Sequence, residues 1–339
     1  MSIKSEIAAT LDDGRRITRY RLESPGGLRV DLLDLGATIE AIWAPDRDGN
    51  LANVCHGFAD ARQYAQNAPY FGATIGRFAN RIDRGRFSLD GENFELELSD
   101  VSNGHHLHGG FGGFHSRFWS ATSGDNAVTF ELESSDGDQG YPSSLLTKVT
   151  FSLDGDALRI AYEAANTGGR ATIVNLTNHA YFNLAGGGTI KEHVLTLHAD
   201  AYLPVNETLI PLGEQRPVDE TPFDFRVAKP IGQDFDAAGG YDHCFVLNGD
   251  AGTLRPIARV TEPATGRVME VETDQPGVQF YSGNVLDASP AVGGHGQHTA
   301  FCLETQGFPD APNQPGFPSA RLNAGATFKS ETIYRFAAR

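Results

Sequence analysis

Cysteine is scarce in this sequence, which has three among 339 residues. An odd number without metal-like spacing argues against both a disulfide framework and a zinc ribbon. Two of the three, Cys244 and Cys302, lie inside apolar runs (CFVL and FCL), where a thiol behaves as a small hydrophobic group. We therefore predict three buried free thiols, counting Cys55, and a reducing compartment, the cytoplasm.

Long hydrophobic runs are also missing. The first ten residues, MSIKSEIAAT, do not have the apolar core of a secretory signal, so no signal peptide is expected. The most apolar stretch, residues 32–45, is interrupted by Asp34 and Glu40. It falls short of the roughly 18 apolar residues that a membrane-spanning helix needs. We expect no membrane association through such a helix.

Positive charge is in the minority, with 27 Lys and Arg against 43 Asp and Glu, a formal net charge of -16. Nucleic acids and anionic membranes attract positive surfaces, so neither is an expected partner. Hydrophobic residues make up 40% of the chain and charged residues 21%, as in ordinary globular proteins.

Several nucleotide and hydrolase motifs are absent. The chain has no Gly-Lys pair, which excludes a P-loop, and no G-x-G-x-x-G dinucleotide fingerprint. It also lacks the G-x-S-x-G nucleophile elbow of α/β-hydrolases. Kinase, dinucleotide-dependent dehydrogenase and α/β-hydrolase activities therefore lose their main support.

What the sequence does contain is a succession of strand patterns. Short runs alternate apolar and polar residues, or stay apolar for four to eight positions, and are rich in β-branched and aromatic side chains. With 39 glycines and frequent turn signals, this favours an all-β fold, a sandwich or barrel, with few short helices and a single domain over residues 1–339. The clearest runs are FELEL, VTFELE, LTKVTFSL, LRIAYEA, TIVNLT, VLTLHA, HCFVL, IARVTE, RVMEVET, VQFYS, AFCLET and TIYRFA.

Turns and helices can be placed from local signals. The pairs Asp90-Gly91 and Asp154-Gly155 stand between apolar runs and predict two-residue hairpin turns. Residues 60–66 and, with weaker support, 76–82 are the only plausible helices. On a helix, Arg77 and Arg81 would share one face and could clamp an anion. Alternatively, both are surface charges.

The histidines are clustered at His105, His106 and His108, with His115 close by. Neutral imidazoles on a glycine-rich turn can bind a transition metal. No carboxylate follows at the expected spacing and HExxH is absent, which weakens this interpretation. Solvated loop histidines and a polar catalytic site are the alternatives.

Two other residues are unusual for their surroundings. His179 lies in NLTNHAYFNL, where three asparagines in an apolar strand would need an amide network or a polar ligand. Glu304 lies in the apolar run TAFCLETQGF, where burial would raise the pKa of a carboxylate toward that of a general base. The simpler alternative is that Glu304 faces outward.

Seven segments occur in an order that resembles the aldose 1-epimerase (galactose mutarotase) family: GATIGRFANRI, LHGG, DGDQGYP, NLTNHAYFNL, YDHCFVL, GVQFYSGN and LETQGFPDAPNQPGFPS. The resemblance extends from about Gly36 to the last strand. It implies a large twisted β-sandwich, the galactose mutarotase-like supersandwich, with a polar cleft on one sheet.

The resemblance also implies residue roles. Glu304 of LETQ corresponds to the general base and His179 of NHAYFNL to the general acid. Five further residues correspond to substrate-binding positions: Asn80, Arg81, His108, Asp242 and Gln279. The implied activity is interconversion of the α and β anomers of free aldoses such as glucose or galactose.

This activity implies a sugar substrate and needs neither metal nor cofactor, because a carboxylate and an imidazole suffice for the proton transfers. A hexose-6-phosphate epimerase would need additional arginines for the phosphate. A non-catalytic sugar-binding module would not need an acid and a base together. A metal-dependent hydrolase or isomerase built on the histidine cluster is the most distant alternative.

Overall fold

Antiparallel strands follow one another along nearly the whole chain in the computed structural model, which describes residues 3–339. The largest sheet has nine strands, and three of them, β13, β14 and β27, have 10 to 12 residues. Burial alternates strictly along β13, as expected for a strand with one face on the core. In spatial order the sheet is β11 (Ser120–Ser123), β12 (Ala127–Ser134), β13 (Leu145–Asp154), β14 (Ala157–Asn166), β27 (Thr327–Ala338), β23 (Arg267–Thr273), β22 (Arg255–Thr261), β17 (Val194–Leu197) and β20 (Lys229–Pro230).

Two five-stranded sheets accompany this large sheet. The first is a meander of β1 (Lys4–Thr10), β2 (Arg16–Glu23), β3 (Arg29–Leu33), β4 (Thr38–Pro45) and β5 (Leu51–Asn53). The second runs in the order β19 (Arg216–Pro217), β18 (Ala199–Tyr202), β21 (Asp242–Leu247), β24 (Gly277–Tyr281) and β25 (Cys302–Gln306). Four two-stranded ladders complete the set: β10 (His106–Leu107) with β7 (Arg81–Ile82), β15 (Thr172–Ile173) with β26 (Arg321–Leu322), β16 (Thr177–Asn178) with β6 (Thr74–Ile75), and β8 (Arg86–Leu89) with β9 (Glu92–Glu95).

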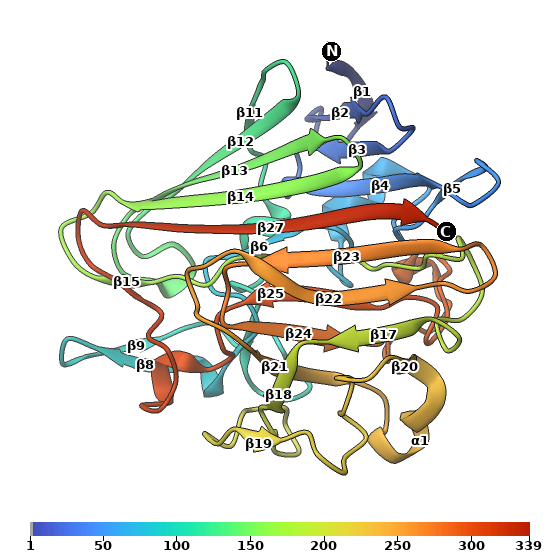
Figure 1. Cartoon of the computed structure of the whole chain (residues 1–339). Helices are drawn as coiled ribbons and strands as arrows, with labels where there is room; N and C mark the ends of the chain where they lie inside the picture. Colours follow the sequence, from blue (N-terminus) through green and yellow to red (C-terminus); the bar gives the residue numbers. More distant parts are fainter. Residues whose placement is uncertain (1–2) are drawn as a thin grey trace.

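The sheets form layers around one large hydrophobic core. Figure 1 shows β24 and β25 behind β22 and β23 of the nine-stranded sheet. The Tyr334 hydroxyl of β27 donates to the Leu303 carbonyl of β25 at 3.1 Å, which links the two layers. Phe151 of β13, Phe280 of β24 and Ile42 of β4 belong to the same buried cluster. The expectation of an all-β sandwich is therefore confirmed, while a single domain over residues 1–339 stays a prediction.

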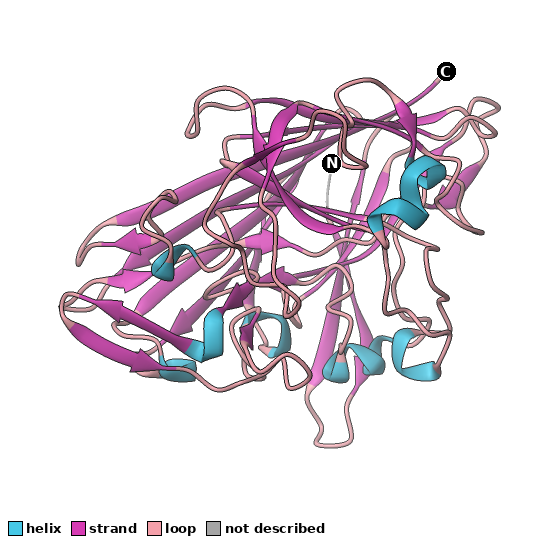
Figure 2. Cartoon of the chain, turned by 90° about the horizontal axis from the view of Figure 1, so that it is seen from below, coloured by secondary structure: helices cyan, strands magenta, loops and turns pink. Residues whose placement is uncertain are grey.

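Helices are short and lie in the connections (Figure 2). The only α-helix in residues 3–339 is α1 (Phe235–Ala238). The 3-10 helices are Ala61–Gln66, Asp83–Gly85, Phe114–Ser116, Asp138–Gly140, Ile231–Asp234, Pro290–Val292 and Ala311–Asn313. Within residues 3–339, no helix is long and apolar enough to cross a membrane.

The expected helix at 60–66 is found as a 3-10 helix over Ala61–Gln66, capped by the Asp60 side chain, which accepts from the Arg62 N–H. The expected helix at 76–82 is wrong. That segment runs from β6 to β7, and its backbone pairs with other segments, as when Ala79 N–H donates to the Asn175 carbonyl. Because long-range pairing replaces helical hydrogen bonds, the two arginines do not share a helical face.

One of the two predicted hairpin turns is placed correctly. Asp90 and Gly91 both have positive φ and connect β8 to β9, as a two-residue turn of this type requires. The second hairpin joins β13 and β14, but Asp154 pairs with Ala157, so the loop is Gly155-Asp156. Positive φ falls on Gly155 alone of these two residues, which explains the shift by one position. The N-terminal meander was not among the predicted strands.

Candidate active site

A cleft of about 710 Å³ brings together six of the seven residues that the sequence singled out. They come from ladder β10-β7, the segment after β16, and strands β21 and β25. The seventh, Gln279, is buried and lies directly opposite Glu304 in the pairing of β24 with β25. The residues in the cleft are Asn80, Arg81, His108, His179, Asp242 and Glu304.

Glu304 lies on β25 and is 2% exposed, so the alternative of an outward-facing side chain is wrong. Its carboxylate oxygen Oε2 is buried and has no hydrogen-bond partner. Burial, reinforced by the nearby Asp242 carboxylate and opposed by Arg81, raises the pKa of Glu304 well above its ordinary range. A carboxylate left unpaired inside a protein is costly, which is typical of a site that awaits a ligand.

His179 follows the two-residue strand β16 and faces Glu304, with its Nε2 atom 3.6 Å from Oε1 of the carboxyl group. Its other ring nitrogen, Nδ1, is 3.6 Å from the sulfur of Cys302. The ring stacks on Tyr181, with 5.0 Å between ring centroids. Burial lowers the pKa of His179 to about 3, so the isolated imidazole is neutral at physiological pH.

The side-chain amides of the three asparagines around His179 donate hydrogen bonds to backbone carbonyl groups of other segments. Asn175 donates to the carbonyls of Ala79 and Gly307, and Asn178 donates to Gly72. Asn183 donates to Gly188 and Thr299. Of the two alternatives raised by the sequence, an amide network is therefore present, and it holds the segment that carries His179.

His108 follows β10 with a positive φ of 53° and places its ring 5.2 Å from that of His179. The backbone N–H of Asn80 donates to its Nδ1 atom at 3.2 Å. Because Nδ1 accepts this hydrogen bond, the neutral ring carries its proton on Nε2. Burial keeps the pKa of His108 well below its ordinary value, so His108 is an uncharged hydrogen-bond donor.

A metal ion can be tested against this arrangement. Ligating atoms of His108, His179 and Glu304 lie within 4.8 Å of one another. A metal needs a free lone pair on each imidazole. In His108 one nitrogen already accepts the Asn80 N–H and the other bears the proton, so this residue fits a hydrogen-bonding role better than a metal.

The other clustered histidines do not join the cleft. His106 bonds the Glu97 carbonyl through Nδ1 and the Tyr141 hydroxyl through Nε2. His105 accepts from the backbone N–H of Arg84. Their proximity in sequence thus reflects local packing, and only His108 lines the site.

Charged groups on the cleft wall form a connected network. Arg81 donates through Nε to Asp100 at 2.9 Å, and its Nη1 atom is 3.9 Å from an Asp242 oxygen. Gln279 donates to the other Asp242 oxygen at 2.6 Å. Gln279 therefore helps to orient Asp242, and the direct substrate contact that the resemblance implies for it stays a prediction. Arg77 is elsewhere: it is 2% exposed and donates to carbonyls of Ser134, Pro142 and Ser143.

The sequence did not single out Asp100, Cys302 or Tyr70 as site residues. Asp100 and Tyr70 line the cleft, and the Tyr70 ring lies edge-on to that of His108. Asp100 sits in a polar loop with nothing to distinguish it from other acidic residues. Cys302 did have a signal, because it precedes Glu304 by two positions and so shares its face of the strand.

The comparison with family models matches residues 18–335 to the aldose 1-epimerase model. The chain belongs to the aldose 1-epimerase family. It is 46% identical to human galactose mutarotase over 95% of each chain, and 37% identical to the aldose 1-epimerase of Escherichia coli (strain K12), covering 98% of this chain and 99% of the relative. Among solved structures, the galactose 1-epimerase from Lactobacillus acidophilus superposes with a TM-score of 0.86 at 28% identity, covering 99% of each chain.

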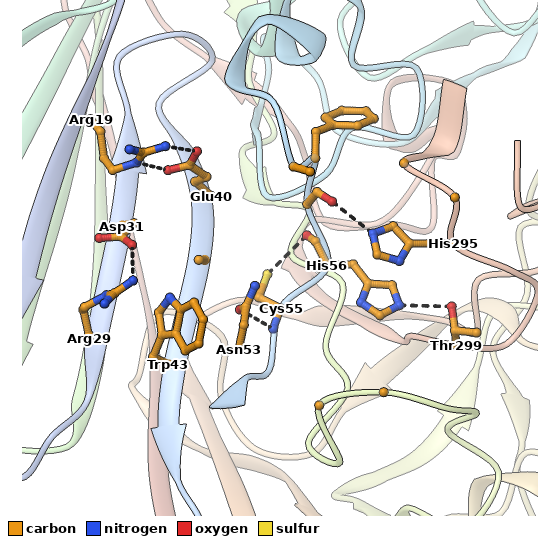
Figure 3. Close-up of a pocket in the computed structure, with 18 of the residues that line it drawn as sticks. Arg19, Arg29, Asp31, Glu40, Trp43, Asn53, Cys55, His56, His295 and Thr299 are labelled. Atoms are coloured by element: carbon orange, nitrogen blue, oxygen red, sulfur yellow. Dashed lines mark hydrogen bonds and ion pairs between the residues drawn. The ribbon is translucent and has the colours of Figure 1, made fainter. Parts of the chain in front are cut away.

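This epimerase has a second cavity of about 720 Å³ that the sequence did not indicate. Figure 3 shows Arg29, Asp31 and Trp43 on the strands that form one side, and His56 and His295 on the other. Its carboxylates are all paired: Arg19 forms a bidentate ion pair with Glu40, and Arg21 and Arg29 both bind Asp31. The two histidine rings stack with centroids 3.9 Å apart.

Proposed function

We propose that this enzyme interconverts the α and β anomers of free aldoses, with Glu304 as general base and His179 as general acid. The observation that carries the proposal is the buried pair itself, Glu304 Oε1 and His179 Nε2, 3.6 Å apart in the cleft. An acid and a base this close can both reach the two oxygens bonded to one anomeric carbon. Family membership supports the same activity.

The reaction balances with these two groups alone. Glu304 accepts the proton of the C1 hydroxyl, the C1–O5 bond breaks as the C1=O1 double bond forms, and His179 delivers its Nε2 proton to O5. The open aldehyde turns about the C1–C2 bond. His179 then takes back the O5 proton as O5 attacks the other face of C1, and Glu304 returns its proton to O1.

The pair works while it holds one proton. Burial lowers the pKa of His179 to about 3, so above that pH Glu304 and His179 cannot both be protonated. The last proton is retained to a pH well above the usual carboxylate range, because the pKa of Glu304 is raised. The reactive form places this proton on His179. We therefore expect a broad pH plateau bounded by two macroscopic values of the pair.

The remaining polar groups suit sugar hydroxyls. We propose that Arg81, Asn80 and Asp242 hold hydroxyls in the cleft, that His108 donates its Nε2–H, and that Gln279 acts by orienting Asp242. Among residues 3–339, Arg81 is the only arginine that lines the cleft, and it already contacts two carboxylates. This arrangement disfavours a phosphorylated hexose, which would need unpaired cationic donors.

Carbohydrate metabolism on free hexoses fits the cleft, and the relatives' names support galactose in particular. We also propose a cytoplasmic location. Its support is that Cys55, Cys244 and Cys302 are all free and buried, as expected in a reducing compartment.

Polarimetry on freshly dissolved α-anomers tests the proposal. We expect the wild-type enzyme to accelerate the change in rotation for several aldoses, and to do so equally after exhaustive dialysis against a chelator. A protein that binds the sugars without accelerating mutarotation would be a binding module. Activity lost on chelation and restored by a metal would favour a metal-dependent mechanism instead.

A further inference from the structure

We propose that Cys302 is a positioning residue for His179: its thiol holds Nδ1, so that Nε2 is the nitrogen that exchanges protons with the substrate. The sulfur lies 3.6 Å from Nδ1, and both residues are buried. The proposal rests on His179 being the acid, and it assigns a role to a thiol that the proton transfers themselves do not use.

Strand geometry places the thiol and the base at the two nitrogens of one ring. Cys302 and Glu304 are two residues apart on β25, so they project from the same face of the strand, about 7 Å apart along it. Cys302 meets Nδ1 and Glu304 meets Nε2, on opposite sides of the imidazole. Among residues 3–339, these are the only side chains that hydrogen-bond or ion-pair with this ring.

The chemistry of a thiol suits an acid better than the usual partners of histidine do. A carboxylate at Nδ1, as in hydrolase triads, stabilises the imidazolium and makes the ring a base. Cys302 remains an uncharged S–H, because burial raises the pKa of its thiol well above the ordinary value. A weak neutral partner orients the ring without stabilising its charge, so the proton on Nε2 is released readily.

The sulfur serves both states of the ring, because it can accept a hydrogen bond from Nδ1–H in each. When His179 is protonated, Nδ1–H donates to the sulfur and Nε2 carries the second proton. Once that proton has passed to O5, the neutral ring keeps its remaining proton on Nδ1, and the lone pair of Nε2 is free to take the O5 proton back.

Three variants test the role. We expect Cys302→Ala to lower kcat by roughly tenfold with little change in KM, the low end of what loss of a ring-orienting partner costs at other histidine sites. Cys302→Ser should restore most of the rate, because a hydroxyl also donates and accepts. Cys55→Ala is the matched control: that thiol is equally buried, but it contacts a backbone carbonyl.

A second measurement does not depend on activity. In enzyme labelled with 15N-histidine, nitrogen chemical shifts report which ring nitrogen bears the proton. We expect neutral His179 to carry it on Nδ1, facing the sulfur or hydroxyl, in the wild type and in Cys302→Ser, and to become a mixture of tautomers in Cys302→Ala. If the alanine variant does not fold, the wild-type spectrum decides: a proton on Nδ1 supports the proposal, and a proton on Nε2 or a mixture contradicts it.

Three results would reduce Cys302 to a packing residue. They are an unchanged kcat in Cys302→Ala, a loss of kcat that Cys302→Ser does not restore, and the same His179 tautomer in the wild type and in Cys302→Ala. A normal rate in His179→Asn would instead remove His179 as the acid. That result would leave the tautomer measurement standing, so the two proposals can fail separately.

Discussion

The cleft and the second cavity have nearly equal volumes, about 710 Å³ and about 720 Å³, but they differ in how their charged side chains are paired. In the second cavity the buried carboxylates are fully engaged, Asp31 by two arginines and Glu40 by Arg19. In the cleft, Glu304 keeps an unpaired oxygen and faces an imidazole at 3.6 Å.

A buried polar atom without a hydrogen-bond partner does not by itself mark the difference, because the second cavity contains two such atoms. Arg29 Nε and Trp43 Nε1 are buried without partners, but the guanidinium stacks over the indole at 4.7 Å. Such stacking offsets part of the cost of leaving these donors unpaired. Volume therefore does not identify the reactive site, whereas an unpaired buried carboxylate beside a neutral histidine does.

The largest expected effect concerns the reactive pair. We expect Glu304→Gln or His179→Asn to lower kcat by about two to four powers of ten, because each removes one proton transfer. The double variant should lose much less than the product of the two single effects, since the residues act in one step. Polarimetric kcat and KM, with circular dichroism to verify folding, provide the measurement. A near-normal rate in Glu304→Gln at pH 7 would remove the base from the mechanism.

A smaller effect is expected on the cleft wall. Arg81→Ala and Asp242→Ala should raise KM by roughly tenfold or more with less change in kcat, because they hold hydroxyls in the ground and transition states alike. Steady-state polarimetry over a range of sugar concentrations separates the two constants. Collapse of kcat at constant KM would assign these residues to the chemistry instead.

The stability of the fold in acid links the two cavities, because each contains a neutral histidine, His179 buried in the cleft and His56 partly buried in the second cavity. Burial lowers the pKa of both His179 and His56 to about 3. Between about pH 3 and the pKa of an unfolded histidine, near 6.5, the unfolded chain binds more protons than the folded protein. The free energy of unfolding therefore decreases as the pH falls. Each histidine should contribute about 1 kcal/mol per pH unit. Urea unfolding from pH 7 to 4.5 should show a smaller slope for His56→Asn, and an unchanged slope would contradict this account.

The smallest effect on catalysis is expected in the second cavity. Glu40→Gln should leave kcat and KM within about twofold of the wild type, because the carboxylate pairs only with Arg19. Its free energy of unfolding should fall by about 1–2 kcal/mol, since it leaves a half-buried guanidinium with weaker partners. A strong loss of kcat in this folded variant would break the distinction between the two cavities.

Local patterns predicted most of the long strands, because alternation along β13 or β27 is a property of neighbouring residues. They failed where tertiary pairing prevailed, as in the segment 76–82 and at Gly155. The resemblance named seven residues, and the structure brings six of them together in the cleft. The seventh, Gln279, donates to Asp242, and its predicted contact with substrate stays a prediction.

By itself, the sequence determined an all-β class, the residue types of an acid-base pair and the order of the family motifs. These features depend on side-chain chemistry and short-range periodicity, which can be read from the sequence without knowing which residues are in contact. Only the tertiary structure decided that Glu304 and His179 share one buried site, that Cys302 lies at the far side of the same imidazole, and that Arg77 is a structural residue while Arg81 faces the cleft. Distances between remote segments and the burial of charge depend on how sheets pack, and no local pattern encodes them.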